Sequence, residues 1–292
     1  MPPTPSTQRS VKSAERALDL LETIGKSPSG LTFTMLSEKL NIPKSSLHAL
    51  LDVLRSRDYI ELDPNSRLYT LGVRVWETGF AYHRHHNAAQ LAVEAMTAIV
   101  DKVNETTQYA KLVGSENVYL AKVESTHPLR LQSEVGVRLP AHATGIGKAL
   151  LAQLDDEEVR SRLPNEQLQR FTDNTIVTVT SLLEELHAIR QRGFAIDNEE
   201  YSQGIFCVAV PVPEPTGRPA TALSVSVPVS RATREGLVTI LGELASGSLS
   251  LAGRLGGKYS DPQLESLRDS AWADGCISQI TKSGSYKLSF LD

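Results

Sequence analysis

Apolar residues near the start of the chain recur at the three- and four-residue spacing of amphipathic helices. The spacing predicts a first helix over residues 11–24, with Ser10 placed to cap its start, and a second helix over residues 34–40. The apolar residues expected to face inward are Val11, Ala14, Leu18, Leu21 and Ile24 in the first helix and Met35, Leu36 and Leu40 in the second.

A third helix is predicted after the break at residues 41–43 and extends to about Arg57, because proline suits the first turn of a helix. Its apolar residues form one stripe, made of Leu47, Leu50, Leu51 and Leu54. The residues outside the stripe are polar or charged, namely Lys44, Ser45, Ser46, His48, Asp52 and Arg55. One face of this helix therefore packs, and the other is free to contact a partner.

Two short alternating runs at residues 59–62 and 68–71 flank a turn at residues 63–66 and predict a β-hairpin. Three short helices closed by a hairpin are typical of a winged helix-turn-helix, whose third helix enters the major groove of DNA. The candidate DNA contacts are Lys44, Ser45, Ser46, His48 and Arg55 on the third helix and Arg67 on the wing. A small helical bundle with a solvated face, and a winged helix that binds another protein, remain alternatives.

Residues 72–92 predict a linking helix, in which Val73, Trp76 and Phe80 share one apolar face. Such a face needs cover, and the same helix of a second subunit would provide it. Packing against its own domain is the alternative. The predicted limits are 10–75 for the DNA-binding domain and 76–93 for the linking helix.

The pattern changes beyond residue 94, where a short helix is followed by segments rich in β-branched residues. The predicted strands lie at residues 109–113, 117–123, 206–212 and 220–229, and further helices at 145–153 and 181–192. This pattern predicts an α+β domain over residues 94–256, with a sheet covered by helices. Ala222, Ser224 and Ser226 alternate onto one face, which favours antiparallel pairing.

Length and charge agree with two globular domains. The chain has 292 residues, of which 40% are hydrophobic, and this is sufficient for two separate cores. Its net charge is −4, but residues 1–75 contain ten Lys and Arg against eight Asp and Glu, a net +2, so the remaining 217 residues carry −6. The asymmetry is mild and suits a small DNA-contacting domain attached to an acidic body.

Cysteine content and hydropathy indicate the cellular compartment and the kinds of site that are excluded. The two cysteines, Cys207 and Cys276, form no CxxC pair, so we expect neither a disulfide framework nor a metal site, and no cofactor. No apolar run approaches the roughly 20 residues of a membrane span, and the first ten residues are polar and rich in proline. We therefore expect a cytoplasmic protein without membrane contact.

An enzyme is the competing class, but its motifs are weak. GIGK at residues 145–148 lacks the spacing of a Walker phosphate loop, and no GxSxG occurs. The histidines His83, His85 and His86 cluster without a helical i, i+4 metal pair. The acidic group Asp197, Glu199 and Glu200 proves little without a cleft to hold it. We predict no catalytic residues.

Four blocks of the chain together resemble the IclR family of bacterial transcriptional regulators. They are NIPKSSLHALLDVLRSRDYIELDPNSRLYTLG at 41–72, VGVRLPAHATGIGKALLA at 135–152, RGFAIDNEEYSQGIFCVAVPV at 192–212 and ALSVSVPVSR at 222–231. The resemblance implies a winged helix-turn-helix, a linking helix and a GAF- or PAS-like domain that binds a small organic acid or aromatic metabolite. It also implies a homodimer or homotetramer on palindromic double-stranded operator DNA, acting as repressor or activator of a metabolic, often catabolic, operon.

Carried over position by position, the resemblance places an effector pocket at Ala143, Thr144, Gly145, Ile146, Asp197, Cys207, Ser224 and Ser226. The residues add support of their own. Gly145 and Gly147 precede a helix whose free N–H groups suit a carboxylate, and two serines on one strand face offer hydroxyls. The alternatives are a tight turn for the glycines, a small buried hydrophobe for Cys207, and serines satisfied within the sheet.

Residues 257–292 continue beyond the end of the resemblance. An added helix with a small hairpin, an extra oligomer contact and a disordered end are the open alternatives, and the role of this extension is unknown.

Overall fold

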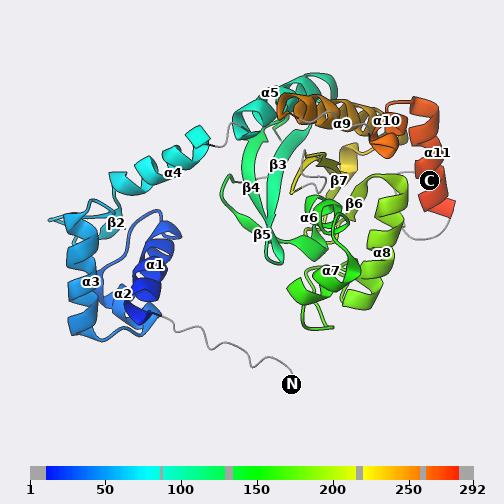
Figure 1. Ribbon diagram of the computed structural model, residues 1–292. Coiled ribbons are helices and arrows are strands. Elements are labelled where there is room, and N and C mark those ends of the chain that lie inside the picture. Colours follow the sequence, from blue (N-terminus) through cyan, green and yellow to red (C-terminus); the bar gives the residue numbers. More distant parts are fainter. Residues whose placement is uncertain (1–10, 86–87, 129–133, 215–219, 257–260, 283–292) are drawn as a thin grey trace. The chain divides into compact units, whose positions relative to one another are not determined.

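The structure is a computed structural model that describes residues 11–85, 88–128, 134–214, 220–256 and 261–282. The chain divides into two compact units, Met1–His86 (unit 1) and Asn87–Asp292 (unit 2) (Figure 1). Each unit has its own apolar core and is described by itself.

Unit 1 contains four helices and a hairpin among its described residues. In chain order these are α1 (Lys12–Gly25), α2 (Phe33–Leu40), α3 (Lys44–Ser56), β1 (Ile60–Leu62), β2 (Tyr69–Leu71) and α4 (Val73–His85). The two strands pair antiparallel, with Ile60 opposite Leu71. An isolated bridge between Leu31 and Tyr69 ties the segment before α2 to the hairpin. This is the predicted winged helix-turn-helix.

The stripe predicted for the third helix forms the centre of the unit 1 core. Leu47, Leu51 and Leu54 are buried and Leu50 is half-buried. Together with Leu20, Ile24, Leu36 and Ile60 they form one apolar cluster. The remaining residues of α3 are free of this packing role.

The inward faces predicted for the first two helices are partly wrong. Val11 is 64% exposed, Leu18 is 60% exposed and Met35 is 41% exposed, whereas Leu20 and Ile24 are the buried residues of α1. Both helices carry apolar residues on more than one side, so helical spacing alone allows several stripes and only packing against α3 selects one. The predicted cap Ser10 lies outside the described residues.

α4 keeps its apolar face exposed within unit 1. Val73, Trp76 and Phe80 are 55%, 66% and 47% exposed, and the two aromatic rings stack with centroids 5.1 Å apart. The chain resumes as α5 (Ala88–Val103), whose Ala89 and Ala92 are buried in unit 2. Residues 88–93, predicted as the end of the linking helix, thus pack in the second unit.

Unit 2 is built on a six-stranded sheet with strand order β5-β4-β3-β8-β7-β6. Every neighbouring pair is antiparallel, as predicted. Its strands are β3 (Thr106–Val113), β4 (Glu116–Val123), β5 (Arg138–Pro140), β6 (Ala195–Asn198), β7 (Ile205–Val212) and β8 (Thr221–Pro228). Its other elements are α5, η1 (Ala141–Ala143), α6 (Gly145–Leu151), α7 (Asp156–Arg162), α8 (Val179–Arg192), η2 (Val229–Arg231), α9 (Arg234–Arg254), α10 (Pro262–Leu267) and α11 (Ser270–Lys282).

Helices cover both faces of the sheet (Figure 1). On one face α5 and α9 pack against Leu223, Val225 and Val227 of β8, and on the other α6, α7 and α8 form a second apolar cluster. Because strand residues alternate between faces, Ser224 and Ser226 lie on the side of α6. The α+β class is confirmed.

Part of the carboxy-terminal extension is folded onto unit 2. Leu264 and Leu267 of α10 and Ile277 of α11 are buried in the same cluster as α9, and the Arg234 Nε donates to Asp274 Oδ1 at 2.6 Å. Of the open alternatives, added helices are therefore present. The described residues 261–282 form helices and contain no hairpin, and residues 257–260 and 283–292 lie outside the described part of the chain.

α9 is the one helix among the described residues that is long and apolar enough for a membrane span by length and composition. Its residues Leu237, Leu241 and Leu244 are nevertheless buried in the unit 2 core. Its apolar character is accounted for by packing between the sheet, α5 and the two terminal helices.

Candidate functional site

The start of α3 is positioned by a tight connection from α2. Thr32 caps α2 by accepting a hydrogen bond from the Met35 N–H at 3.3 Å. Asn41 ends α2 in the left-handed conformation, with φ 49°, and the Ser37 hydroxyl donates to the Ile42 carbonyl at 3.2 Å. Pro43 then directly precedes α3.

The side chains predicted to contact DNA lie on the surface of α3. Lys44, Ser45, His48 and Arg55 are exposed and Ser46 is half-buried. Lys44, Ser45 and His48 share one side of the first turns, since residues three and four apart are neighbours on a helix. The His48 ring also lies against the Phe33 ring, with the ring centroids 4.6 Å apart and the planes tilted by 35°.

Arg67, the sixth candidate, lies in the hairpin turn. Its φ of 59° places it in the left-handed region, where it closes a turn held by Asp63, whose Oδ1 accepts from Asn65 N at 2.8 Å and Ser66 N at 2.7 Å. These hydrogen bonds lower the pKa of Asp63. The exposed Arg67 is thus presented on an ordered turn.

A cavity of about 380 Å³ opens on the α6 side of the sheet in unit 2. Its lining residues are Tyr119, Glu134, Val137, Leu139, Thr144, Gly145, Ile146, Asp197, Tyr201, Ser202, Ile205, Cys207 and Ser224. Six of the predicted effector residues are therefore brought together here. Ala143 is buried in η1, and Ser226 contacts Cys207 from the neighbouring strand.

Close approach of the backbone explains the glycines before α6. A Cβ at position 147 would lie 2.3 Å from the Ala141 Cα, and one at position 145 would lie 3.3 Å from the Asp197 nitrogen. Thr144 caps the helix by accepting from Gly147 N at 3.2 Å. The glycines allow η1, α6 and β6 to meet, so they do more than form a turn.

A polar cluster under the cavity satisfies both serines. Ser224 and Ser226 donate to Gln108 Oε1 at 3.0 and 3.2 Å, and the Cys207 sulfur lies 3.2 Å from the Ser226 hydroxyl. Within the described part of the chain, Gln108 Nε2 has no partner. The sequence analysis missed Gln108, although a glutamine in an otherwise buried strand was a usable signal.

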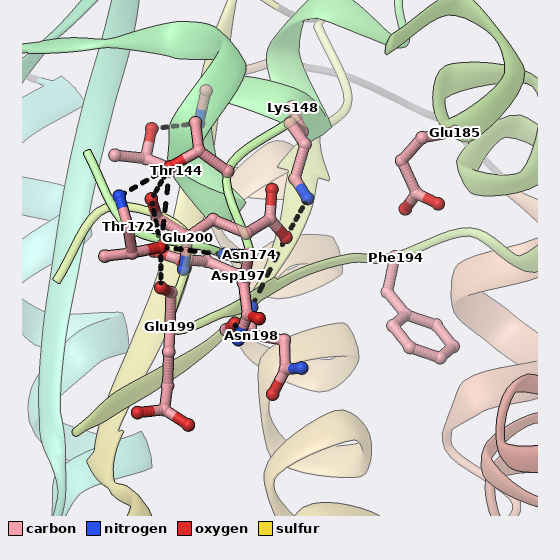
Figure 2. A network of polar contacts seen from close by, with 12 residues as sticks. Thr144, Lys148, Thr172, Asn174, Glu185, Phe194, Asp197, Asn198, Glu199 and Glu200 are labelled. Atoms are coloured by element: carbon pink, nitrogen blue, oxygen red, sulfur yellow. Dashed lines mark hydrogen bonds and ion pairs between the residues drawn. The ribbon is translucent and has the colours of Figure 1, made fainter. Parts of the chain in front are cut away.

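A buried ion pair lies behind the cavity (Figure 2). Lys148 of α6 is fully buried, and its Nζ lies 2.5 Å from Glu200 Oε1. The Glu200 N–H donates to Asp197 Oδ1 at 2.7 Å. Of the acidic residues dismissed for want of a cleft, Asp197 lines the cavity, whereas Glu200 lies behind it, paired with Lys148.

Burial favours the neutral form of three titratable groups that line the cavity. Desolvation and the neighbouring Glu200 raise the pKa of Asp197 to about 8. Desolvation also raises the pKa of the Tyr119 hydroxyl and of the Cys207 thiol. Cys207 is thus a neutral thiol rather than a reactive thiolate.

Two further predictions concern enzyme chemistry. The side chains of His83, His85 and His86 lie outside the described residues. Among the residues that are described, no group of three His, Cys, Asp or Glu side chains is arranged to hold a metal ion.

Family comparison agrees with both units. Residues 13–64 match the IclR helix-turn-helix domain, and residues 80–251 match the family described as bacterial transcriptional regulator IclR C-terminal. The chain belongs to the IclR family. The helices α10 and α11 lie beyond the matched residues, so this member carries folded structure past the family domain.

Known IclR proteins support the assignment over nearly their full length. The HTH-type transcriptional regulator XynR of Escherichia coli (strain K12) is 35% identical over 246 residues, covering 84% of this chain and 98% of XynR. The crystal structure of the Thermotoga maritima IclR is 28% identical, with a TM-score of 0.68 over 85% of this chain and 100% of that one. These relatives are transcriptional regulators.

A third relative shows the same fold. An IclR homologue from Microbacterium hydrocarbonoxydans, solved in complex with 4-hydroxybenzoate, is 23% identical and has a TM-score of 0.74 over 83% of this chain and 98% of that one. At this identity the similarity establishes the fold alone.

Proposed function

We propose that this IclR regulator binds a small organic acid or aromatic metabolite in the unit 2 cavity and thereby changes its affinity for operator DNA. The observation that carries the proposal is the cavity itself, which combines apolar walls with a few polar groups in the manner of small-molecule sites. Its volume of about 380 Å³ suits a ligand of the size of 4-hydroxybenzoate, which the Microbacterium homologue binds.

The cavity offers recognition for a carboxylate and a ring. Thr144, Ser224 and Asp197 present polar groups, and the first-turn N–H groups of α6 add donors. Val137, Leu139 and Ile146 provide apolar walls. Ala143 and Ser226 do not line the cavity, but they adjoin the lining residues Thr144 and Cys207. The role we propose for this site is ligand binding that regulates DNA affinity.

DNA contact is assigned to the exposed residues of α3 and the wing. Lys44, Arg55 and Arg67 meet phosphates, while Ser45, Ser46 and His48 approach base edges. Residues 1–75 have a net charge of +2, whereas the remaining residues carry −6. A net positive charge on this part of the chain agrees with a surface that faces phosphates.

Self-association follows from the apolar face of α4. The stacked and exposed Trp76 and Phe80 need cover, and the same face of a second copy is self-complementary in a two-fold dimer. We propose a cytoplasmic homodimer or homotetramer on a palindromic operator of a metabolic operon. An effector that changes the spacing of two α3 helices then changes the fit to two half-sites.

The DNA assignment is tested by titrating duplex DNA from the upstream region of the gene and its neighbours. Lys44→Ala and Arg67→Ala should weaken binding at all sequences and lower the salt dependence by about one unit of slope each. Arg268→Ala, an exposed arginine of unit 2, is the control and should change neither. Unchanged affinity in the first two variants would favour a protein-binding winged helix instead.

The effector assignment is tested by calorimetry against a panel of aromatic and short-chain carboxylates, with 4-hydroxybenzoate included. A panel member should bind with one site per chain and shift the DNA affinity. Absence of any binding across the panel would contradict the organic-acid class.

A further inference from the structure

The buried cluster behind the cavity contains more acid than base. Two carboxyl groups, Asp197 and Glu200, face a single ammonium group, Lys148. All three are at least nine-tenths buried. Two carboxylates and one ammonium would leave a net negative charge out of water, and burying an uncompensated charge is costly.

The geometry assigns the lysine to Glu200. Glu200 Oε1 receives both the Lys148 ammonium at 2.5 Å and the Asn198 N–H at 3.3 Å. The backbone carbonyl of Glu200 is fixed by Thr175, whose hydroxyl donates to it at 2.6 Å, and Figure 2 shows the lysine and Glu200 side chains pointing toward each other. Glu200 is therefore the carboxyl group that the ammonium contacts. Lys148 and two backbone N–H groups also favour the charged form of Asp197, but desolvation and the neighbouring Glu200 outweigh them.

The other groups around Asp197 supply no compensating charge. Cys207 of β7 and Tyr119 of β4 are held neutral by burial. Tyr201, in the following turn, lines the same cavity with an uncharged ring. Glu134 is an exposed acid at the cavity, and Glu185 of α8 is paired with Arg192 at 2.5 Å.

We infer that the Lys148–Glu200 ion pair keeps Asp197 protonated, so that the effector pocket presents a neutral carboxylic acid as a hydrogen-bond donor to an anionic carboxylate ligand. This inference rests on the proposed function for the identity of the ligand class, but the protonation state does not. Lys148 and Glu200 are positioning residues, since neither lines the cavity.

The consequence for binding is selective and pH-dependent. A protonated Asp197 donates its O–H to the ligand carboxylate, whereas an ionised Asp197 would repel it. Once the pH exceeds the Asp197 pKa of about 8, binding requires uptake of one proton from solvent. Affinity for a carboxylate should then fall about tenfold for each further pH unit, while affinity for the matching neutral amide should stay constant.

The protonation state is tested first, without ligand, by infrared spectroscopy of the full chain. At pH 7 the C=O stretching band of a protonated carboxyl group should be present, and it should disappear with a midpoint near the Asp197 pKa of about 8. The band should be missing in Asp197→Asn and retained in Asp173→Asn, an exposed acid outside the cavity. Absence of the band at pH 7, or its persistence in Asp197→Asn, would overturn the inference.

Two variants separate the positioning role from a purely structural one. Glu200→Gln frees Lys148 to pair with Asp197, so the band should be lost at pH 7 even though the side chain shape is conserved. The difference in unfolding free energy between wild type and Asp197→Asn gives a second readout. The folded state retains this proton and the unfolded state releases it near pH 3.8, so wild type should lose stability relative to Asp197→Asn as the pH rises from about 4 to about 8.

Binding is then measured with benzoate and benzamide, neither of which has a group that titrates between pH 6 and pH 10, over that pH range. The benzoate should lose affinity above pH 8 in wild type and not in Asp197→Asn. A carboxylate that binds wild type equally at pH 7 and pH 10 would contradict the inference. A panel in which no carboxylate binds would contradict the proposed function alone, because the infrared result stands independently.

Discussion

Two helices of this protein, one in each unit, lie in opposite environments. α3 starts with Lys44, Ser45 and Ser46 after a proline, and α6 starts with Gly145, Ile146 and Gly147 after a threonine. In α3 only Leu47, Leu51 and Leu54 are buried, whereas all seven residues of α6 are buried. The polar side chains of α3 are therefore accessible to a partner, whereas the ammonium group of Lys148 on α6 is paired inside the protein.

The energetics of ion pairs differ between the two helices for the same reason. Arg55 and Asp52 on α3 are 3.6 Å apart with side chains 56% and 65% exposed, so water screens their attraction. The Nζ of Lys148 on α6 and the Oε1 of Glu200 are 2.5 Å apart, and both side chains are buried. Loss of one partner should therefore be serious only in the second pair.

The largest expected effect comes from Lys148→Met. This change leaves the Glu200 carboxylate buried without its cation, which should lower the free energy of unfolding of unit 2 by about 3 to 5 kcal/mol. Urea denaturation of the full chain measures it. The double variant Lys148→Met/Glu200→Gln should recover more than half of the loss, and failure to recover would show that the lysine stabilises through packing instead.

Gly147→Ala should have the next largest effect. The added Cβ would lie 2.3 Å from the Ala141 Cα, and the backbone shift should cost about 3 kcal/mol. Gly253→Ala is the matched control, because no atom lies within 4 Å of its added Cβ in α9, and alanine in a helix should stabilise by about 0.5 to 1 kcal/mol. Thermal unfolding followed by circular dichroism compares the two.

Ser224→Ala combined with Ser226→Ala should act mainly on ligand binding. Both hydroxyls are hydrogen-bonded to Gln108, so their removal should cost about 1 to 2 kcal/mol in stability and weaken a bound carboxylate about tenfold. Calorimetry with the carboxylate found in the panel measures the second effect. An unchanged affinity would show that the ligand lies elsewhere.

Arg55→Ala should have the smallest effect on stability. Since its pair with Asp52 is exposed, the free energy of unfolding should change by less than about 0.5 kcal/mol. DNA affinity should nevertheless fall and the salt dependence should decrease by about one unit of slope. If Arg55→Ala lowers the stability but keeps the DNA affinity, Arg55 has a structural role, and the proposed DNA contact at this residue is wrong.

The sequence was informative wherever one pattern allowed only one packing. The stripe of leucines in α3 has a single side that can be buried, and that prediction is confirmed. The alternation of Ala222, Ser224 and Ser226 correctly predicted antiparallel pairing, although both faces of β8 are buried. α1 offers two apolar sides, and there the prediction for Val11 and Leu18 is wrong. Ambiguity in periodicity, rather than weak propensity, produced the error.

The cavity shows the same limit for buried polar residues. Its glycines and serines belong to local motifs and were predicted, whereas Gln108, Tyr119, Lys148 and Tyr201 were not. Nothing in local spacing reveals that Gln108 on β3 lies opposite Ser224 on β8. Those partners come from distant segments and meet only across strands.

The sequence by itself therefore determined the elements of unit 1, four of the six strands of the unit 2 sheet and the exposed face of α3, because each follows from local periodicity. It did not predict β5, β6, α7 or α9. Only the tertiary structure decided which carboxyl group Lys148 pairs with and which one is left facing the cavity. The physical reason is that charge balance in a buried cluster depends on distances between residues 52 positions apart, and those distances exist only after the sheet and its helices have assembled.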